Sequence, residues 1–257
     1  MDTTQQNSSA WDQKVEEGSR YTKAVSTQMI EKAKQGDWGI TVTTEKNVPR
    51  KWFPESLKGL KILCLASGGG QQAPILAAAG ADVTVTDISK KQLEQDQMVA
   101  ERDQLSLRIV QGDMIDLSDF KDESFDMVVN PVSNLFVKDI QPVWREAHRV
   151  LKKNGVLITG FTNPLLWIFD DEEERKGHLE VKHAIPSSTL DYLQEGEVEA
   201  YIQSNQTIEY AHTLEDQIQG QIDAGFAITG FYEDDFGGTR ILDKHIKTFI
   251  ATRAVKL

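Results

Sequence analysis

The sequence contains one cysteine, Cys64, among its 257 residues. A single thiol cannot form an internal disulfide, and it cannot supply a multi-cysteine metal site. Cys64 also lies in a short apolar stretch that reads as a buried strand. We therefore expect no metal centre, and we expect a protein suited to the reducing cytoplasm.

Long hydrophobic runs and an excess of basic residues are also missing. No apolar stretch approaches the ~20 residues needed to cross a bilayer, and residues 2–9 lack the apolar core of a signal peptide. The 28 Lys and Arg are outnumbered by 40 Asp and Glu, which gives a net charge of −12. Because this charge repels phosphate backbones, we expect neither nucleic acid nor a membrane as a partner.

The sequence does have a strand, a glycine turn and a helix in direct succession. Residues 61–65 are apolar, Gly68–Gly70 follow, and residues 73–79 form a helical pattern that ends at Gly80. Glycines allow a backbone to approach a ligand closely, and the next helix directs its unpaired amides toward the same place. The stretch predicts a ligand site at the glycine turn.

Further strands and helices alternate along the chain, which predicts a doubly wound parallel sheet of the α/β class. Two final strands have no helix between them, so we expect them to pair antiparallel. The expected later strands cover residues 81–86, 105–110, 125–130, 156–161, 226–232 and 247–255, with helices over 89–102, 140–153 and 213–224.

Two regions lie outside this alternation. Residues 1–60 are expected to form a helical cover over the glycine turn, with 1–10 disordered and 11–38 helical. Residues 61–257 are expected to form the main domain. An acidic segment at about 162–210 breaks the pattern, and we interpret it as an insertion that covers the strand ends.

Two acidic residues follow strands in positions suited to an adenosine cofactor. Asp87 lies 17 residues after Gly70 and could accept hydrogen bonds from both ribose hydroxyls. Asp113 and Met114 follow the third strand and suit an adenine amino group and ring face. Since residues 68–73 also satisfy G-x-G-x-x-A, a nicotinamide or flavin dinucleotide enzyme is an alternative.

Four features occur in the order and spacing of a known family: Ile62–Gly70, Asp87, Asp113 and Arg149–Gly155. In these the sequence resembles the class I S-adenosylmethionine-dependent methyltransferases. The resemblance implies a Rossmann-like seven-stranded sheet of order 3-2-1-4-5-7-6 with an antiparallel last strand. It also implies in-line methyl transfer from S-adenosylmethionine to a small-molecule acceptor, with S-adenosylhomocysteine as product. The cofactor residues it implies are Ala66, Ser67, Gly68, Gly70, Asp87, Ile88, Asp113, Met114 and Asn130.

The sequence departs from this family at two positions. Cys64 stands where the family usually has an acid that helps to hold the methionine end of the cofactor, and Ala66 replaces a glycine. Ser67, backbone groups near Asn130 or the N-terminal cover could substitute for the acid. A non-catalytic cofactor-binding module is therefore a second alternative.

Candidates for the acceptor side come from the end of the chain and from the insertion. His212 precedes the helix at 213–224 and could act as a general base, since imidazole titrates near neutral pH; a surface histidine at a helix entry is the alternative. Residues Phe161, Asn163, Trp167 and Phe169 follow the fifth strand, where we expect the acceptor pocket.

The acid after the second strand provides a direct test of the cofactor site. Replacing Asp87 with alanine should weaken S-adenosylmethionine binding by about 1–3 kcal/mol, because a charged acceptor of hydrogen bonds is lost. Isothermal calorimetry measures the change. Unchanged affinity would remove Asp87 from the site.

Overall fold

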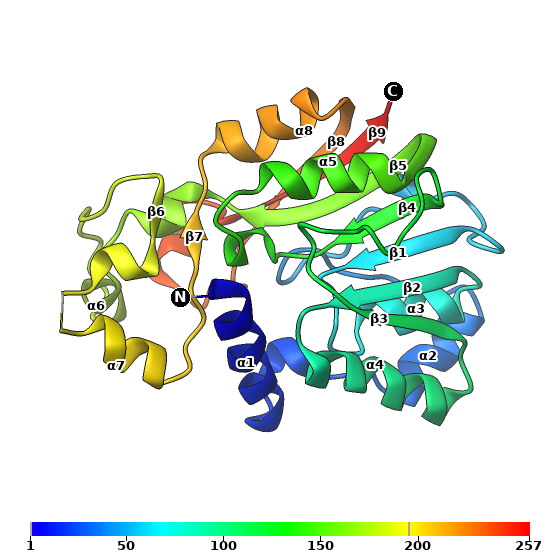
Figure 1. Cartoon of the computed structure of the whole chain (residues 1–257), viewed down its shortest axis with the longest axis horizontal. Helices are drawn as coiled ribbons and strands as arrows, with labels where there is room; N and C mark the ends of the chain where they lie inside the picture. The colour runs from blue at the N-terminus through cyan, green and yellow to red at the C-terminus, as the bar shows by residue number, and fades with distance from the viewer. Residues whose placement is uncertain (1, 195) are drawn as a thin grey trace.

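A seven-stranded sheet forms the centre of the computed structural model, which describes residues 2–194 and 196–257 (Figure 1). The strands lie in the order β3-β2-β1-β4-β5-β9-β8, with β1 to β5 parallel and β9 antiparallel to both of its neighbours. The strands are β1 Lys61–Leu65, β2 Asp82–Asp87, β3 Leu107–Gln111, β4 Phe125–Asn130, β5 Leu151–Thr162, β8 Phe226–Asp234 and β9 Phe249–Lys256.

This order confirms the predicted sheet, because β8 and β9 take the places of the expected sixth and seventh strands. Two-residue strands β6 and β7 form a separate small sheet within the insertion. Their bounds, with those of the helices, are α1 Thr3–Glu16, α2 Thr27–Lys34, α3 Gln72–Ala78, α4 Lys90–Asp103, α5 Gln141–Val150, α6 Asp171–Arg175, β6 Ser187–Ser188, α7 Val198–Gln203, β7 Tyr210–Ala211 and α8 Gly220–Asp223.

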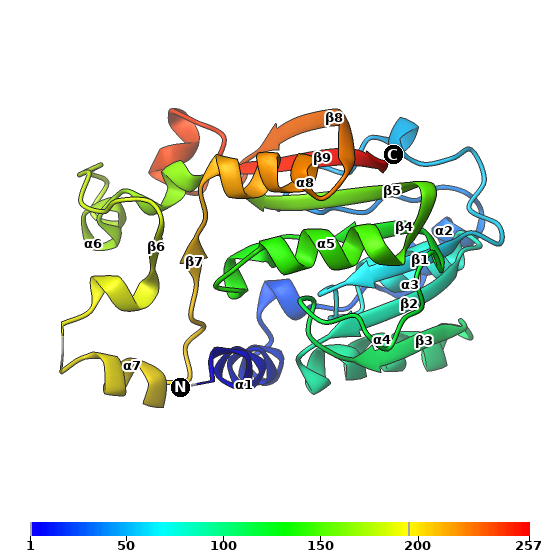
Figure 2. The same cartoon turned by 45° about the horizontal axis from the view of Figure 1, so that its top comes forward.

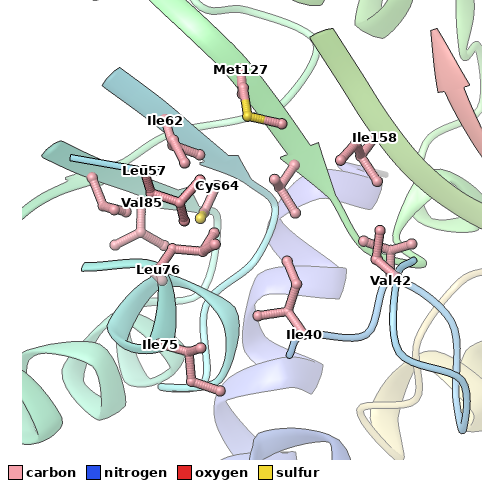
Figure 3. Close-up of a cluster of buried hydrophobic side chains, with 14 of the residues drawn as sticks. Ile40, Val42, Leu57, Ile62, Cys64, Ile75, Leu76, Val85, Met127 and Ile158 are labelled. Atoms are coloured by element: carbon pink, nitrogen blue, oxygen red, sulfur yellow. The ribbon is translucent and has the colours of Figure 1, made fainter. Parts of the chain in front are cut away.

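Alternation of side chains along β1 divides the core into two layers. Ile62 and Cys64 pack into a cluster with residues of α2, α3 and α4, whereas Leu63 and Leu65 pack on the other face against α5. Figure 3 shows Cys64 among the apolar side chains of the first cluster, beside residues such as Val85. Because both faces are covered, β1 is buried along most of its length and ends at the glycine turn.

Helix α5 ends earlier than the sequence pattern predicts. The expected helix ran to residue 153, but α5 stops at Val150 and β5 begins at Leu151. Leu151 is fully buried and pairs with Phe125 of β4. Burial and strand pairing of Leu151 thus outweigh the helical pattern. Asn154, which lies just beyond the expected end of the helix, has a left-handed conformation (φ 62°), but this residue lies within β5.

The prediction of disorder at the N-terminus is wrong for residues 3–10, which belong to α1; Met1 lies outside the described residues. Asn7 is buried and exchanges hydrogen bonds with the backbone of Ile208 on the distant insertion. The single helix expected over 11–38 is also wrong. It is divided into α1 and α2, with Gly18 at φ 69° after the end of α1.

The insertion lies on the same side of the molecule as α1 in both views (Figures 1 and 2). Hydrogen bonds join them, since Gln6 donates to the carbonyl oxygen of Ile202 and Asn205 donates to that of Ser9. In the part of the chain that the structure describes, no helix has the length and apolar character to span a bilayer.

A segment of the N-terminal cover crosses the sheet at Gly160 of β5. The carbonyl oxygen of Val42 accepts a hydrogen bond from the amide of Val132 at 3.0 Å. A Cβ added at Gly160 would lie 1.9 Å from the same oxygen. The cover therefore contacts the strand backbone directly, and only glycine fits beneath it.

Replacing Gly160 with alanine should destabilise the protein by about 3 kcal/mol, the upper part of the range for overpacked cores. The methyl group would force the Val42 segment away from β5. Chemical denaturation measures the loss. Gly196→Ala is the matched control, since a Cβ there meets nothing within 4 Å, and equal losses in the two variants would contradict the contact.

Candidate active site

A cavity of about 550 Å³ opens at the carboxyl ends of the central strands. Its lining comes from the glycine turn, the ends of β2 and β3, the loop after β4, helix α1 and the insertion. In doubly wound sheets, ligands bind in this position. The cavity therefore lies where the sequence predicts a cofactor.

The glycine turn after β1 is held by a carboxylate from the neighbouring strand. The amide of Gly68 donates to Oδ2 of Asp87 at 2.9 Å, and a Cβ on Gly68 would lie 2.6 Å from Cβ of Gln92. Gly70 has a φ of 68°, which favours glycine, and Ala66 adopts a left-handed conformation (φ 46°) where the family usually has glycine. These constraints explain the glycines in the motif.

A second carboxylate, that of Asp96 on α4, approaches the turn from behind. Its Oδ2 accepts from the amide of Gly69 at 3.1 Å, and this amide also donates to the carbonyl oxygen of Gln92 at 2.9 Å. Burial raises the pKa of Asp96 to about 8. Burial also raises the pKa of Asp87 to about 6, although the amides of Ser89 and Gly68 oppose the shift.

Asp113 and Met114, which follow Gly112 after the end of β3, lie on the cavity, as the sequence predicts. Oδ2 of Asp113 accepts from the hydroxyl of Thr4 at 3.0 Å, so α1 is tied to this loop. The sulfur of Met114 accepts from Ser133 Oγ at 3.6 Å, which fixes the apolar side chain against the loop after β4. This wall of the cavity therefore carries an acidic and an apolar side chain from two consecutive residues.

Comparison with known proteins identifies the family. A methyltransferase domain family matches residues 63–159. A Bacillus subtilis protein named uncharacterized methyltransferase YbaJ is 58% identical over 251 residues, which cover 98% of this chain and 97% of that protein. The chain belongs to the class I S-adenosylmethionine-dependent methyltransferases. Its cofactor is accordingly S-adenosylmethionine.

Solved structures share the fold of this methyltransferase at low sequence identity. An S-adenosylmethionine-dependent methyltransferase from Mesorhizobium loti has a TM-score of 0.61 at 19% identity and covers 80% of this chain and 95% of its own. A geranyl diphosphate methyltransferase in complex with geranyl diphosphate and sinefungin has a TM-score of 0.54 at 14% identity, covering 79% of this chain and 74% of its own.

Most of the expected cofactor residues line the methyltransferase cavity, but two do not. The lining includes Ala66, Ser67, Gly68, Asp87, Ile88, Asp113 and Met114. Gly70 lies behind the turn, where a Cβ would be 2.9 Å from Cβ of Ala24. Asn130 is buried and donates to the carbonyl oxygen of Leu65 and to Ser133 Oγ, so its amide braces β1 against the loop after β4.

The residues at the cavity wall fit the chemistry of an adenosylated sulfonium. Asp87 and Asp113 offer carboxylate oxygens to hydroxyl and amino groups, and the turn leaves no side chain at Gly68. Gln92 also lines the cavity, and its Oε1 is buried without a protein hydrogen-bond partner. A buried acceptor of this kind calls for a donor from a ligand or water.

The described residues, 2–194 and 196–257, contain no group of three His, Cys, Asp or Glu side chains arranged to hold a metal ion. The chemistry available at the cavity wall is that of carboxylates, hydroxyls, amides and aromatic rings, with the basic groups of Lys14, Arg20 and Arg240.

His212 does not line the cavity of the methyltransferase. Its Nε2 lies 3.1 Å from the carbonyl oxygen of Asn134 and 3.0 Å from that of Val137, so this nitrogen donates to the backbone. Burial lowers the pKa of the ring. In this position His212 ties the start of the last helical segment to the loop after β4.

Of the four residues expected around the acceptor, only Trp167 lines the cavity. Phe161 is fully buried in the core, Asn163 caps the turn at 164–167, and Phe169 pairs with Val181 within the insertion. Successive side chains of β5 point to opposite faces of the sheet, and the chain turns after the strand. Neighbouring residues in this stretch therefore could not all line the same wall of the cavity.

Several cavity residues were not predicted from the sequence. Thr4 and Lys14 come from α1, Glu209 from the insertion, and Arg240 from the turn before β9. Burial raises the pKa of Glu209. Lys14 is a polar residue of an expected helix and the others belong to segments without strong periodicity, so only the tertiary structure brings them to the site.

Buried Asp96 predicts a pH dependence of stability. A carboxyl with a pKa of about 8 when folded and near 3.8 when unfolded contributes stability that is complete below pH 3.8 and is lost as the pH approaches 8. Between pH 5.5 and 8.5, the Tm of the wild type should therefore fall relative to that of Asp96→Asn.

Differential scanning calorimetry measures the Tm of both proteins at each pH. Groups that titrate alike in the two proteins do not contribute to the difference between their Tm values. Asp103→Asn is the control, because that carboxylate lies on the same helix and pairs with Arg102. A gap between wild type and Asp96→Asn that stays constant with pH would contradict the shifted titration.

Proposed function

We propose that this methyltransferase transfers the methyl group of S-adenosylmethionine to a small-molecule acceptor by in-line displacement. The observation that carries the proposal is one cavity whose lining includes both Asp87 and Asp113, which lie at the carboxyl ends of β2 and β3, and Trp167 and Phe236, which follow β5 and β8. Its volume of about 550 Å³ lies in the usual range for small-molecule sites. Helix α1 contributes to the same wall, which favours a discrete acceptor over a polymer.

S-adenosylmethionine supplies an electrophilic methyl group, so the chain has mainly to hold two molecules in line and exclude water. We assign the cofactor to Ala66, Ser67, Gly68, Gly70, Asp87, Ile88, Asp113, Met114 and Asn130, with Gly70 and Asn130 acting through the turn. Where the acceptor must lose a proton, Glu209 is the ionisable group we propose for it, because it lines the cavity and burial raises its pKa. His212 has its Nε2 engaged by two carbonyl oxygens.

A dinucleotide oxidoreductase is disfavoured by the hydrogen bonds of the turn. A pyrophosphate binds where glycine-turn amides are free to donate to it. Here the amides of Gly68 and Gly69 donate to the carboxyl groups of Asp87 and Asp96. Neither amide is therefore free to bind a pyrophosphate, and the carboxylate of Asp87, ionised above its pKa of about 6, repels an anion and suits a cationic sulfonium.

A small-molecule acceptor also agrees with the net charge of the protein and with the ligand of a methyltransferase of similar fold. The net charge of −12 disfavours nucleic acid, and we propose action on free metabolites in the cytoplasm. The geranyl diphosphate methyltransferase of similar fold takes a small molecule. Its acceptor is an anion. The cavity here is lined by five acidic residues (Glu45, Asp87, Asp113, Asp171 and Glu209) and three basic ones (Lys14, Arg20 and Arg240), and Arg20 and Arg240 are already paired with Glu45 and Glu174. The excess of acidic groups favours a neutral or cationic acceptor.

The test combines a labelled methyl donor with a variant at the acceptor end. Metabolite extracts incubated with labelled S-adenosylmethionine should yield a labelled small molecule. Trp167→Ala should raise the KM for that acceptor about tenfold, because an aromatic wall is lost, while the Kd for S-adenosylmethionine stays unchanged.

Leu257→Ala, at the exposed carboxyl terminus, is the control variant. Binding of S-adenosylmethionine without methyl transfer to any acceptor would favour the non-catalytic module. Binding of NAD in place of S-adenosylmethionine would contradict the proposal altogether.

A further inference from the structure

Strand β1 brings no acid to the glycine turn. Cys64 is 0% exposed and points into the apolar cluster between the sheet and α3 (Figure 3). Burial raises the pKa of its thiol, and the charge of nearby Asp96 adds to the shift. Cys64 is therefore a neutral core residue, and the acid whose charge affects it, Asp96, comes from another element, α4.

The groups that could replace an acid at position 64 are already engaged. Ser67 Oγ donates to Oε1 of Gln72 at 3.1 Å. The amide nitrogen of Asn130 donates to the backbone of Leu65, and its oxygen accepts from Thr159. None of these contacts restrains the amides of the glycines that follow.

Asp96 does restrain them. Its Oδ2 accepts from the amide of Gly69 at 3.1 Å, and the amides of Gly70 and Gly69 both oppose the rise of its pKa. The side chain is 0% exposed. Helix α4 also touches the turn directly, because a Cβ on Gly70 would lie 3.0 Å from the carbonyl oxygen of Gln95.

Stability alone does not account for an acid at position 96. Burying a carboxyl group carries a large desolvation cost, and Oδ1 of Asp96 has no hydrogen-bond partner within the described structure. An apolar residue of similar size would avoid that cost. The presence of a carboxyl group at position 96 is explained if the glycine turn needs a hydrogen-bond acceptor on the side that faces α4.

We propose that Asp96 is a positioning residue for the cofactor: its carboxyl group, carried by α4, holds the glycine turn in the conformation that binds S-adenosylmethionine. It supplies from the helix the acid that β1 lacks at Cys64. With Asp87 on the other side, it fixes consecutive amides of the turn, Gly68 by Asp87 and Gly69 by Asp96. The proposal rests on the cofactor site at this turn, but the restraint of the turn can be measured without cofactor.

Hydrogen–deuterium exchange of the peptide covering residues 66–73 tests the restraint in the free protein. Asp96→Ala should accelerate exchange at Gly69 and Gly70 by about tenfold, the effect of losing one buried hydrogen bond; the bond from the Gly69 amide to the carbonyl oxygen of Gln92 remains in every variant. Asp96→Asn should change it little, because the amide oxygen still accepts. Asp103→Ala, a buried acid at the far end of α4, is the matched control and should leave the turn unchanged.

Calorimetry with S-adenosylmethionine tests the consequence for binding. Asp96→Ala should raise Kd about tenfold, whereas Asp96→Asn and Asp103→Ala should stay within about threefold of the wild type. In the double variant Cys64→Asp with Asp96→Ala, an acid returns to β1, and the affinity and the exchange should recover toward the wild type. Circular dichroism confirms that each variant is folded.

Equal exchange at the turn in Asp96→Ala and Asp103→Ala would overturn the proposal, whether or not the protein binds S-adenosylmethionine. Faster exchange without loss of affinity would also overturn it, since the turn would be loosened with no effect on the cofactor. A folded double variant that recovers neither property would show that Asp96 does not replace an acid at position 64. Failure of the wild type to bind S-adenosylmethionine would instead count against the cofactor site.

Discussion

The hydrogen bonds between the glycine-turn amides and two carboxyl groups are the constraint on which the site depends. Asp87 fixes Gly68 from the neighbouring strand, and Asp96 contacts Gly69 from α4. Helix α4 must therefore sit close against the turn, and glycine is required where side chains would collide with it. Asp12 of α1 accepts from Ser89 and from the amide of Lys91 at the start of α4, so the N-terminal cover is attached to the same helix.

Sequence reasoning predicted the sheet because its signals are local. Short apolar strands, glycine punctuation and alternating helices determine a parallel sheet with little help from distant contacts. The positions of Asp87 and Asp113 follow from the same logic, since carboxyl ends of parallel strands meet at one edge. The antiparallel pair at the chain's end was predicted for a similar reason, as no helix separates the two strands.

What the sequence could not predict depends on contacts between distant segments. Helix α1 is held in place by polar side chains such as that of Asn7, whose hydrogen-bond partner, Ile208, lies some 200 residues away in the sequence. The end of α5 is set by pairing of Leu151 with β4. Asp96 lies within α4, and no motif in the adjacent sequence indicates that its side chain contacts the glycine turn.

Helix α1 is attached mainly through polar side chains. Thr4 bonds to the loop after β3, Ser8 and Asp12 bond to the loop between β2 and α4, and the edge-on contact of Trp11 with Phe136 is the main aromatic contact of the helix. Water can replace such bonds, so detaching α1 uncovers little apolar surface, whereas detaching α5 would expose fully buried Trp144. Of these two helices, α1 is thus the one whose release exposes less apolar surface, and it is also the one that lines the cavity.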